Sequence, residues 1–335
     1  MSIDATRPVP FTLSVRSERI ADPASRDESG TAPAMIRGQV WPATGGAGPS
    51  EAGAGPGDEA DDDFPDAQAG DSAIVVLHGF KGFRRWGFFP HVAETLAGAG
   101  HTVVSFDFSL NGVGRGGEDF DELEAFARNT FSRELDETHQ VVEALRGGAL
   151  PGPNPRRVGL LGHSRGGGVA VLAAADLQVH ALVTWAAVAT FDRWSDEVKE
   201  EWRREGRIHI PNARTGQQMP LDVGLLEDLE RNRERLDIEA AAGRILAPWL
   251  IVHGTDDESV SVEDAYRLAR ASAPASAPAG APSSQDAEGG ARLELIEGAG
   301  HTFGAGHPFD GEGPHLAAAL EATRTHFARA LAGPR

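Results

Sequence analysis

Short runs of apolar residues alternate with amphipathic stretches along most of the chain. The apolar runs predict strands at 10–15, 35–41, 73–77, 102–108, 156–161, 180–189, 248–253 and 292–296. Apolar positions at helical spacing predict helices at 90–99, 119–146, 167–177, 262–270 and 315–332. Continuous apolar runs such as AIVVL at 73–77 are typical of strands buried on both faces. The alternation predicts an α/β fold with a doubly wound, mostly parallel sheet, whose first two strands could pair antiparallel at one edge.

Three segments interrupt this pattern within what we expect to be a single domain spanning 1–335. Residues 43–71 are rich in Gly, Ala and Asp, and residues 271–290 are rich in Ala, Ser and Pro. Neither has enough large apolar side chains to offset the entropy of ordering, so both are predicted to be flexible surface insertions. Residues 190–245 lie between two predicted strands and are predicted to form a short lid-like insertion.

Composition narrows the class of protein. The 335 residues include 31 Lys and Arg and 50 Asp and Glu, which gives a net charge of −19. This charge argues against binding to nucleic acid or to an anionic membrane surface. The absence of cysteine excludes disulfides, thiolate zinc sites and a cysteine nucleophile. The sequence shows neither a secretory signal pattern at its start nor an apolar run long enough for a membrane span, so we expect a cytoplasmic protein of undetermined oligomeric state.

The sharpest chemical signal is Gly162-His163-Ser164-Arg165-Gly166, between a predicted strand and a predicted helix. A sharp strand-to-helix turn strains the backbone of a nucleophile, and the flanking glycines remove side-chain atoms that would clash. The turn would raise the Ser164 hydroxyl above the sheet, at a helix N-terminus that favours developing negative charge. A chance serine in a Gly-rich turn is the alternative interpretation.

Serine needs a base, and the base needs an orienting carboxylate. His301 follows the last predicted strand in a Gly-Ala-Gly-His loop, which favours it over His307 as the base. The acid candidates Asp256, Asp257 and Glu258 follow the strand at 248–253. The chain order of serine, acid and histidine is the one expected for this type of turn, and carboxyl ends of parallel strands meet at one edge of a sheet.

Together these three motifs resemble the α/β-hydrolase superfamily, and most of all its dienelactone hydrolase and prolyl-oligopeptidase-like branch. The resemblance implies the α/β-hydrolase fold and a Ser-His-Asp triad, over about residues 73–330 apart from the insertions. In the family's G-x-x-D-x-x-V loop the triad acid is the fourth residue, which falls on Asp257 here. The resemblance further implies that the oxyanion hole is formed by the backbone N–H groups of Arg165 and Phe80, the latter in an HG-x motif.

Candidates for substrate binding lie in two segments. Arg214, Gln217 and Gln218 belong to a proline-bounded loop at 211–220, which could cover the active-site crevice or only connect two helices. Trp86 lies in a stretch of mixed cations and aromatic residues beside the predicted oxyanion hole, where acidic or aromatic acyl groups could bind.

We therefore expect a serine hydrolase without cofactor or metal that cleaves a small-molecule carboxylic ester or thioester through an acyl-enzyme intermediate. Two other classes remain open at this point. One is an aminopeptidase or acyltransferase that uses the same triad. The other is a non-catalytic binding protein with the same fold. The sequence contains neither the GxGxxG dinucleotide motif in its opening strand-helix unit nor the HExxH zinc motif.

Overall fold

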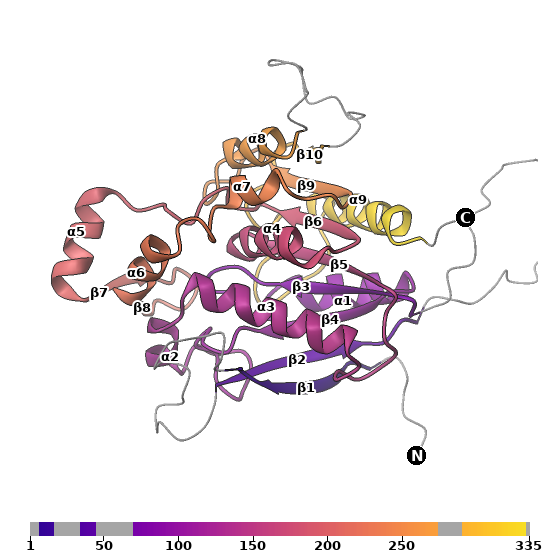
Figure 1. Cartoon of the computed structure of the whole chain (residues 1–335), viewed down its shortest axis with the longest axis horizontal. Helices are drawn as coiled ribbons and strands as arrows, with labels where there is room; N and C mark the ends of the chain where they lie inside the picture. The colour runs from indigo at the N-terminus through magenta and orange to yellow at the C-terminus, as the bar shows by residue number, and fades with distance from the viewer. Residues whose placement is uncertain (1–6, 17–33, 45–69, 274–289, 333–335) are drawn as a thin grey trace, which may run out of the picture.

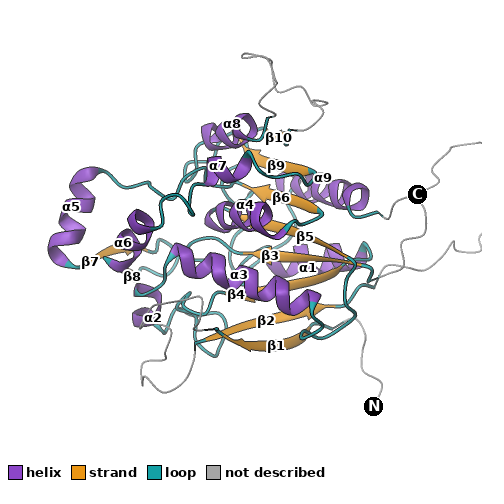
Figure 2. Ribbon diagram, in the orientation of Figure 1, coloured by secondary structure: helices purple, strands orange, loops and turns teal. Residues whose placement is uncertain are grey.

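The computed structural model of the chain describes residues 7–16, 34–44, 70–273 and 290–332. In this part of the chain, eight strands form one sheet in the order β1-β2-β4-β3-β5-β6-β9-β10 (Figure 2). They are β1 (Val9–Ser14), β2 (Met35–Trp41), β3 (Ser72–Leu77), β4 (Thr102–Asp107), β5 (Arg157–His163), β6 (Ala181–Trp185), β9 (Trp249–Gly254) and β10 (Arg292–Ile296). The six strands from β4 to β10 in this order run parallel, while β1 and β2 add an antiparallel edge. The predicted α/β-hydrolase fold is confirmed.

Helices cover both faces of the sheet (Figure 1). One face packs against α3 (Phe131–Arg146), α4 (Arg165–Leu177), α7 (Ile238–Ala242) and α8 (Val262–Ala271), and the other against α1 (Phe89–Gly98) and α9 (Pro314–Ala330). Every residue of β3 and β4 is buried, as the continuous apolar runs predict. The carboxyl ends of the parallel strands consequently share one edge, where loops can gather side chains from distant parts of the sequence.

Two predicted elements differ from the structure. The helix expected at 119–146 is instead α2 (Leu123–Ala127) followed by α3, because Thr130 is extended and its side chain caps α3 by accepting from Arg133 N at 3.3 Å. The strand expected at 180–189 ends at Trp185, because Ala186 takes a positive φ of 48° that ends the extended run.

Most of the segment between β6 and β9 projects from one end of the sheet, whereas its last helix, α7, packs against α4 and α8 (Figure 1). It contains α5 (Asp196–Glu205), the antiparallel hairpin of β7 (Arg207–Pro211) and β8 (Gln218–Asp222), α6 (Gly224–Arg231) and α7. The proline-bounded loop therefore joins the two strands of a hairpin that lies between α5 and α6, rather than joining two helices directly. Most of 43–71 and 271–290 lies outside the described residues. None of the helices in the described ranges is long and apolar enough to cross a membrane.

The packing of α9 on the sheet gives a prediction about stability. Phe327 is fully buried, and its ring lies where a side chain on Gly159 of β5 would collide with it. We expect Phe327→Ala to lower the free energy of unfolding by about 3–5 kcal/mol through lost burial and a residual cavity. Urea unfolding measures this loss. The control Arg329→Ala, on the exposed side of the same helix, should change the free energy of unfolding by less than about 0.5 kcal/mol. Equal losses of stability in the two variants would contradict this account of the core.

Candidate active site

Ser164 occupies a strained turn between β5 and α4. Its backbone has φ 58° and ψ −123°, outside the regions that a non-glycine residue usually adopts. A side chain on Gly162 would collide with the carbonyl oxygen of Gly166, and one on Gly166 with that of His78. Glycine is therefore required on both sides of Ser164, and the turn has the geometry expected of a nucleophile elbow.

His301 reaches Ser164 from a loop that follows β10. The distance from its Nε2 to Ser164 Oγ is 3.0 Å, although the two residues are 137 positions apart. His163 holds this loop in place, because its Nε2 lies 3.0 Å from the backbone oxygen of His301. Burial lowers the pKa of His163 to about 3, so its ring is neutral at physiological pH and donates its Nε2 proton to that oxygen. His307 lies elsewhere and accepts from Gly87 N at 2.9 Å.

Asp257 is the acid that meets His301. Its Oδ2 lies 2.8 Å from His301 Nδ1, and its side chain is fully buried. Its other oxygen accepts hydrogen bonds from the backbone N–H groups of Ser259 at 2.8 Å and Val260 at 2.9 Å. Asp256 is exposed and accepts from its neighbour Thr255 at 3.1 Å. The structure thus brings together Ser164, His301 and Asp257 and leaves Asp256 outside.

A second histidine, His253 of β9, also faces Asp257. Its fully buried Nε2 donates to Val260 O at 2.9 Å and lies 3.4 Å from Asp257 Oδ2. Burial alone would raise the pKa of Asp257, but the hydrogen bonds from His253, His301 and Val260 outweigh it and hold that pKa well below its usual range. Asp257 is therefore ionised at neutral pH, so His301 carries its proton on Nδ1 and offers an unprotonated Nε2 to the Ser164 hydroxyl.

The loop after β3 packs against the elbow. A side chain on Gly79 would lie 2.9 Å from Ser164 Cβ, which shows how closely the two backbones approach. The Gly82 N–H closes the turn on Gly79 O at 3.0 Å. Asp107, at the end of β4, accepts from Arg84 N at 2.7 Å and pairs with its guanidinium, and so braces this loop.

Phe80 and Arg165 lie at one cavity together with Ser164 and His301. Arg165 is the first residue of α4, so its N–H has no acceptor one turn earlier in the helix. Its side chain is held between the rings of Phe80 and Phe131, 4.2 and 4.9 Å from their centroids, and pairs with the buried Glu134 at 3.1 Å. These contacts orient the beginning of α4 beneath Ser164.

The cavity has a volume of about 350 Å³ and opens over Ser164. Its apolar wall is mainly aromatic and includes Phe131, Phe191 and Trp194, with Ile210 contributed by the β7–β8 hairpin. Phe131 and Phe191 stack with ring centroids 4.3 Å apart. The segment between β6 and β9 therefore supplies part of the wall of this cavity.

The structure places the four expected substrate-binding residues away from this cavity. The Arg214 guanidinium lies 5.8 Å from the centroid of the Phe83 ring, and Gln217 donates to Phe120 O at 2.9 Å. Gln218 is exposed on β8, and Trp86 packs against Phe88 and His307. None of these four side chains lines the cavity that contains Ser164.

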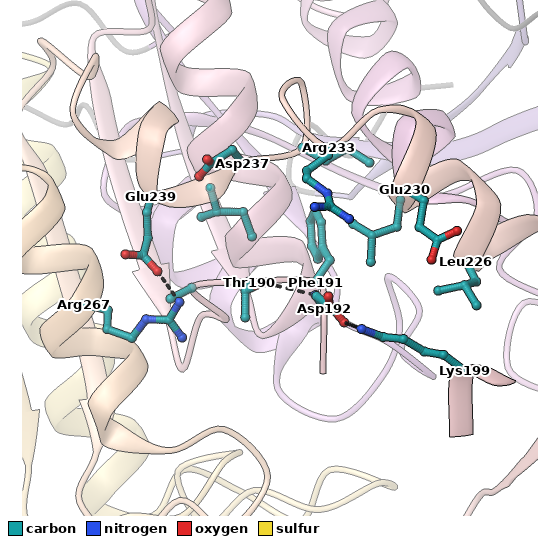
Figure 3. Close-up of a pocket in the computed structure, with 14 residues that line it drawn as sticks. Thr190, Phe191, Asp192, Lys199, Leu226, Glu230, Arg233, Asp237, Glu239 and Arg267 are labelled. Carbon is teal, nitrogen blue, oxygen red and sulfur yellow. Dashed lines mark hydrogen bonds and ion pairs between the residues drawn. The ribbon is translucent and has the colours of Figure 1, made fainter. Parts of the chain in front are cut away.

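A second cavity, of about 340 Å³, shares Thr190 and Phe191 with the first (Figure 3). Two of its cations are paired with acids inside it: Lys199 lies 2.5 Å from Asp192, and Arg267 pairs with Glu239. Among the described residues no group of three or more His, Asp or Glu side chains is arranged to hold a metal ion.

Sequence reasoning missed two residues that support the site. In the sequence, His253 is simply one residue of a predicted buried strand. The one signal for its contact with Asp257 is that it lies four positions earlier in the chain. Glu134 belongs to a predicted helix, and the sequence gives no signal that its carboxylate pairs with Arg165. Glu134 contacts Arg165 from another helix, whereas His253 contacts Asp257 from the strand directly before it.

Comparison with known proteins agrees with this architecture. A family model described as the alpha/beta hydrolase family matches residues 74–312, most of the chain, so the chain belongs to that family. A search of curated proteins finds no match.

Solved structures with the same fold share little sequence. A putative hydrolase from Agrobacterium vitis S4 has a TM-score of 0.62 at 19% identity, covering 96% of this chain and 99% of that one. A monoacylglycerol lipase from Paleococcus ferrophilus gives 0.55 at 17% identity, with 77% and 94% covered. Dienelactone hydrolase from Anabaena variabilis gives 0.53 at 16% identity, with 96% and 98% covered. At these identities the likeness shows the fold alone.

The lowered pKa of Asp257 predicts a pH dependence of stability. An ionised carboxylate that is bonded in the fold contributes stability above its unfolded pKa, and this contribution is lost as the pH falls through the lowered folded value. We expect the free energy of unfolding to fall more steeply between about pH 4 and pH 2 in the wild type than in Asp257→Asn. Urea unfolding across this range measures the slopes. Asp256→Asn, an exposed control in the same loop, should keep the wild-type slope, and parallel curves for wild type and Asp257→Asn would contradict the assignment.

Proposed function

We propose that the chain is a serine hydrolase that cleaves carboxylic esters or thioesters through an acyl-enzyme intermediate. The observation that supports it most is the continuous chain of hydrogen bonds from Ser164 Oγ through His301 to Asp257, with distances of 3.0 and 2.8 Å. This arrangement lets a hydroxyl lose its proton to an imidazole whose positive charge is stabilised by a buried carboxylate.

Ser164 is the proposed nucleophile and His301 the proposed general base. As Ser164 Oγ attacks the substrate carbonyl carbon, its proton passes to His301 Nε2, and Asp257 stabilises the resulting imidazolium through Nδ1–H. His301 then gives the proton to the departing alkoxide or thiolate. A water molecule then enters and bonds to the acyl carbon as it loses a proton to His301. His301 passes that proton to Ser164 Oγ as the acyl–oxygen bond breaks, so the acid is released and the enzyme returns to its starting state.

The proposed oxyanion hole consists of the backbone N–H groups of Phe80 and Arg165. Both residues lie at the cavity that contains Ser164, and the close packing of Gly79 on Ser164 fixes the first of them relative to the nucleophile. The dipole of α4 adds partial positive charge at Arg165. Donors that are fixed before the reaction stabilise the tetrahedral oxyanion without reorganising, and the chemistry uses no cofactor.

Family membership supports hydrolysis, and the names of structural neighbours favour esters. A monoacylglycerol lipase and a dienelactone hydrolase share the fold, and both names describe cleavage of an ester bond. A cavity of about 350 Å³ with an aromatic wall suits a small acyl compound. Turnover of 4-nitrophenyl esters, compared with aminoacyl 4-nitroanilides, separates this function from an aminopeptidase.

The role of Ser164 is tested by its removal. We expect Ser164→Ala to lower kcat/KM for 4-nitrophenyl esters by about 10⁴-fold or more and to abolish labelling by a fluorophosphonate probe, because no other oxygen occupies its place. His301→Ala should cause a loss of similar order. Circular dichroism checks that both variants fold. Near wild-type turnover by Ser164→Ala, or the absence of probe labelling and turnover in the wild type, would overturn the proposed function.

The choice of acid gives a separate prediction with a matched control. Asp257→Asn removes the charge that stabilises the imidazolium and favours the wrong tautomer, so kcat should fall by about 10³–10⁴-fold. Asp256→Asn, one residue away and exposed, should change kcat by less than about threefold. Steady-state kinetics on one ester measures both variants. Comparable losses in the two would mean that Asp257 is not the orienting acid.

A further inference from the structure

The charges around the cavity at Ser164 are of one sign. Lys81, Arg165 and Arg193 line it, and among the described residues no Asp or Glu does. The chain as a whole carries a net charge of −19, so a cavity lined by cations alone runs against the composition of the protein. Desolvated or partly enclosed cations without acids attract anionic ligands.

Arg165 is the one of these three cations that already has a counter-ion. Its guanidinium pairs with Glu134 at 3.1 Å and is sandwiched by two aromatic rings. Burial raises the pKa of Glu134, while the Arg165 charge opposes that rise. Arg165 therefore serves the structure of the elbow, and its charge is compensated before any substrate arrives.

Lys81 and Arg193 are different, because within the described residues neither forms an ion pair with an acid. Lys81 donates to the backbone oxygen of Pro211 at 3.1 Å, and Arg193 donates to that of Ser259 at 2.7 Å. A carbonyl oxygen fixes the position of a cation without neutralising its charge. Lysine has three donors and arginine five, so both side chains keep N–H groups free for a ligand.

These two bonds also place the cations on different walls. Lys81 follows Phe80 in the loop after β3 and is tied to the β7–β8 hairpin, whereas Arg193 follows β6 and is tied to the loop of Asp257. The neighbouring cavity differs, because four acids line it and two of them, Asp192 and Glu239, pair with Lys199 and Arg267 (Figure 3). The Ser164 cavity has no described Asp or Glu in its lining, so Lys81 and Arg193 have no acid within it to pair with.

We propose that the substrate is an anionic ester, with an apolar or aromatic body against Phe131, Phe191 and Trp194 and a carboxylate bound by Lys81 and Arg193. This inference rests on the proposed function and names its substrate class. The carboxylate takes no part in bond making: Ser164 forms the acyl bond, the alcohol leaves with a proton, and water releases the acid. Its role is to orient the scissile carbonyl over Ser164 through charge-assisted hydrogen bonds.

Two matched substrate pairs test the proposal, one for a charge on each side of the ester. The first is mono-4-nitrophenyl glutarate and its methyl ester, which differ by a charge on the acyl side. The second is 4-acetoxybenzoate and methyl 4-acetoxybenzoate, which differ by a charge on the leaving group. We expect wild-type kcat/KM to be about tenfold higher for the anionic member of at least one pair. Reaction with Ser164→Ala measures the uncatalysed background of each ester.

Variants then assign the preference to the two cations. Lys81→Gln and Arg193→Gln should each lower the ratio of anionic to neutral kcat/KM by about three- to tenfold, and added salt should lower it in the wild type. Arg204→Gln is the control: this exposed arginine of α5 pairs with its neighbour Glu205, lines neither cavity and should leave the ratio unchanged.

The outcomes separate this inference from the proposed function. If Ser164-dependent turnover is present but neither anionic ester is preferred, the substrate class is wrong while the serine hydrolase stands. If the preference is present but both cation variants keep it, Lys81 and Arg193 are not the binding groups and the inference fails. If no ester is turned over and the fluorophosphonate probe does not label Ser164, the proposed function itself fails.

Discussion

The site depends on the buried, ionised carboxylate of Asp257. A charge taken out of water is stabilised only when it is fully hydrogen-bonded, and Asp257 receives bonds from two backbone N–H groups and from His301, with His253 close to the same oxygen. Those bonds fix the tautomer of His301, and that tautomer leaves Nε2 free to accept a hydrogen bond from Ser164. In the proposed mechanism Asp257 therefore acts on the Ser164 hydroxyl through His301, without contacting it.

The site depends on the backbone conformation around Ser164 as much as on the charge of Asp257. Two stretches of main chain, 77–79 and 162–166, approach each other so closely there that a side chain at Gly79, Gly162 or Gly166 would collide. This crowding holds Ser164 at a positive φ and brings the loop of Phe80 close to Ser164. Backbone strain of this kind persists only where surrounding packing enforces it, and the fully buried strands β3 and β6, which flank β5, provide that packing.

The segment between β6 and β9 gives the site its particular character. It contributes Arg193, Trp194 and Ile210 to the cavity, and the hydrogen bonds of Lys81 and Arg193 tie it to the loops of the proposed oxyanion hole and of the acid. In the proposed function the sheet and the elbow position the reacting groups, while this segment and the loop after β3 form the cavity that receives the substrate. That division explains how one fold serves many substrates.

The sequence by itself determined the alternation of strands and helices, the elbow at Ser164 and the candidates His301 and Asp257, because these depend on local periodicity, glycine geometry and short motifs. It did not reveal the break before α3, the early end of β6, the contacts of His253 and Glu134, or the cavity wall from which Arg214 and Trp86 are absent. Only the tertiary structure decided these, since they depend on individual backbone angles and on which way each side chain points once the elements are packed.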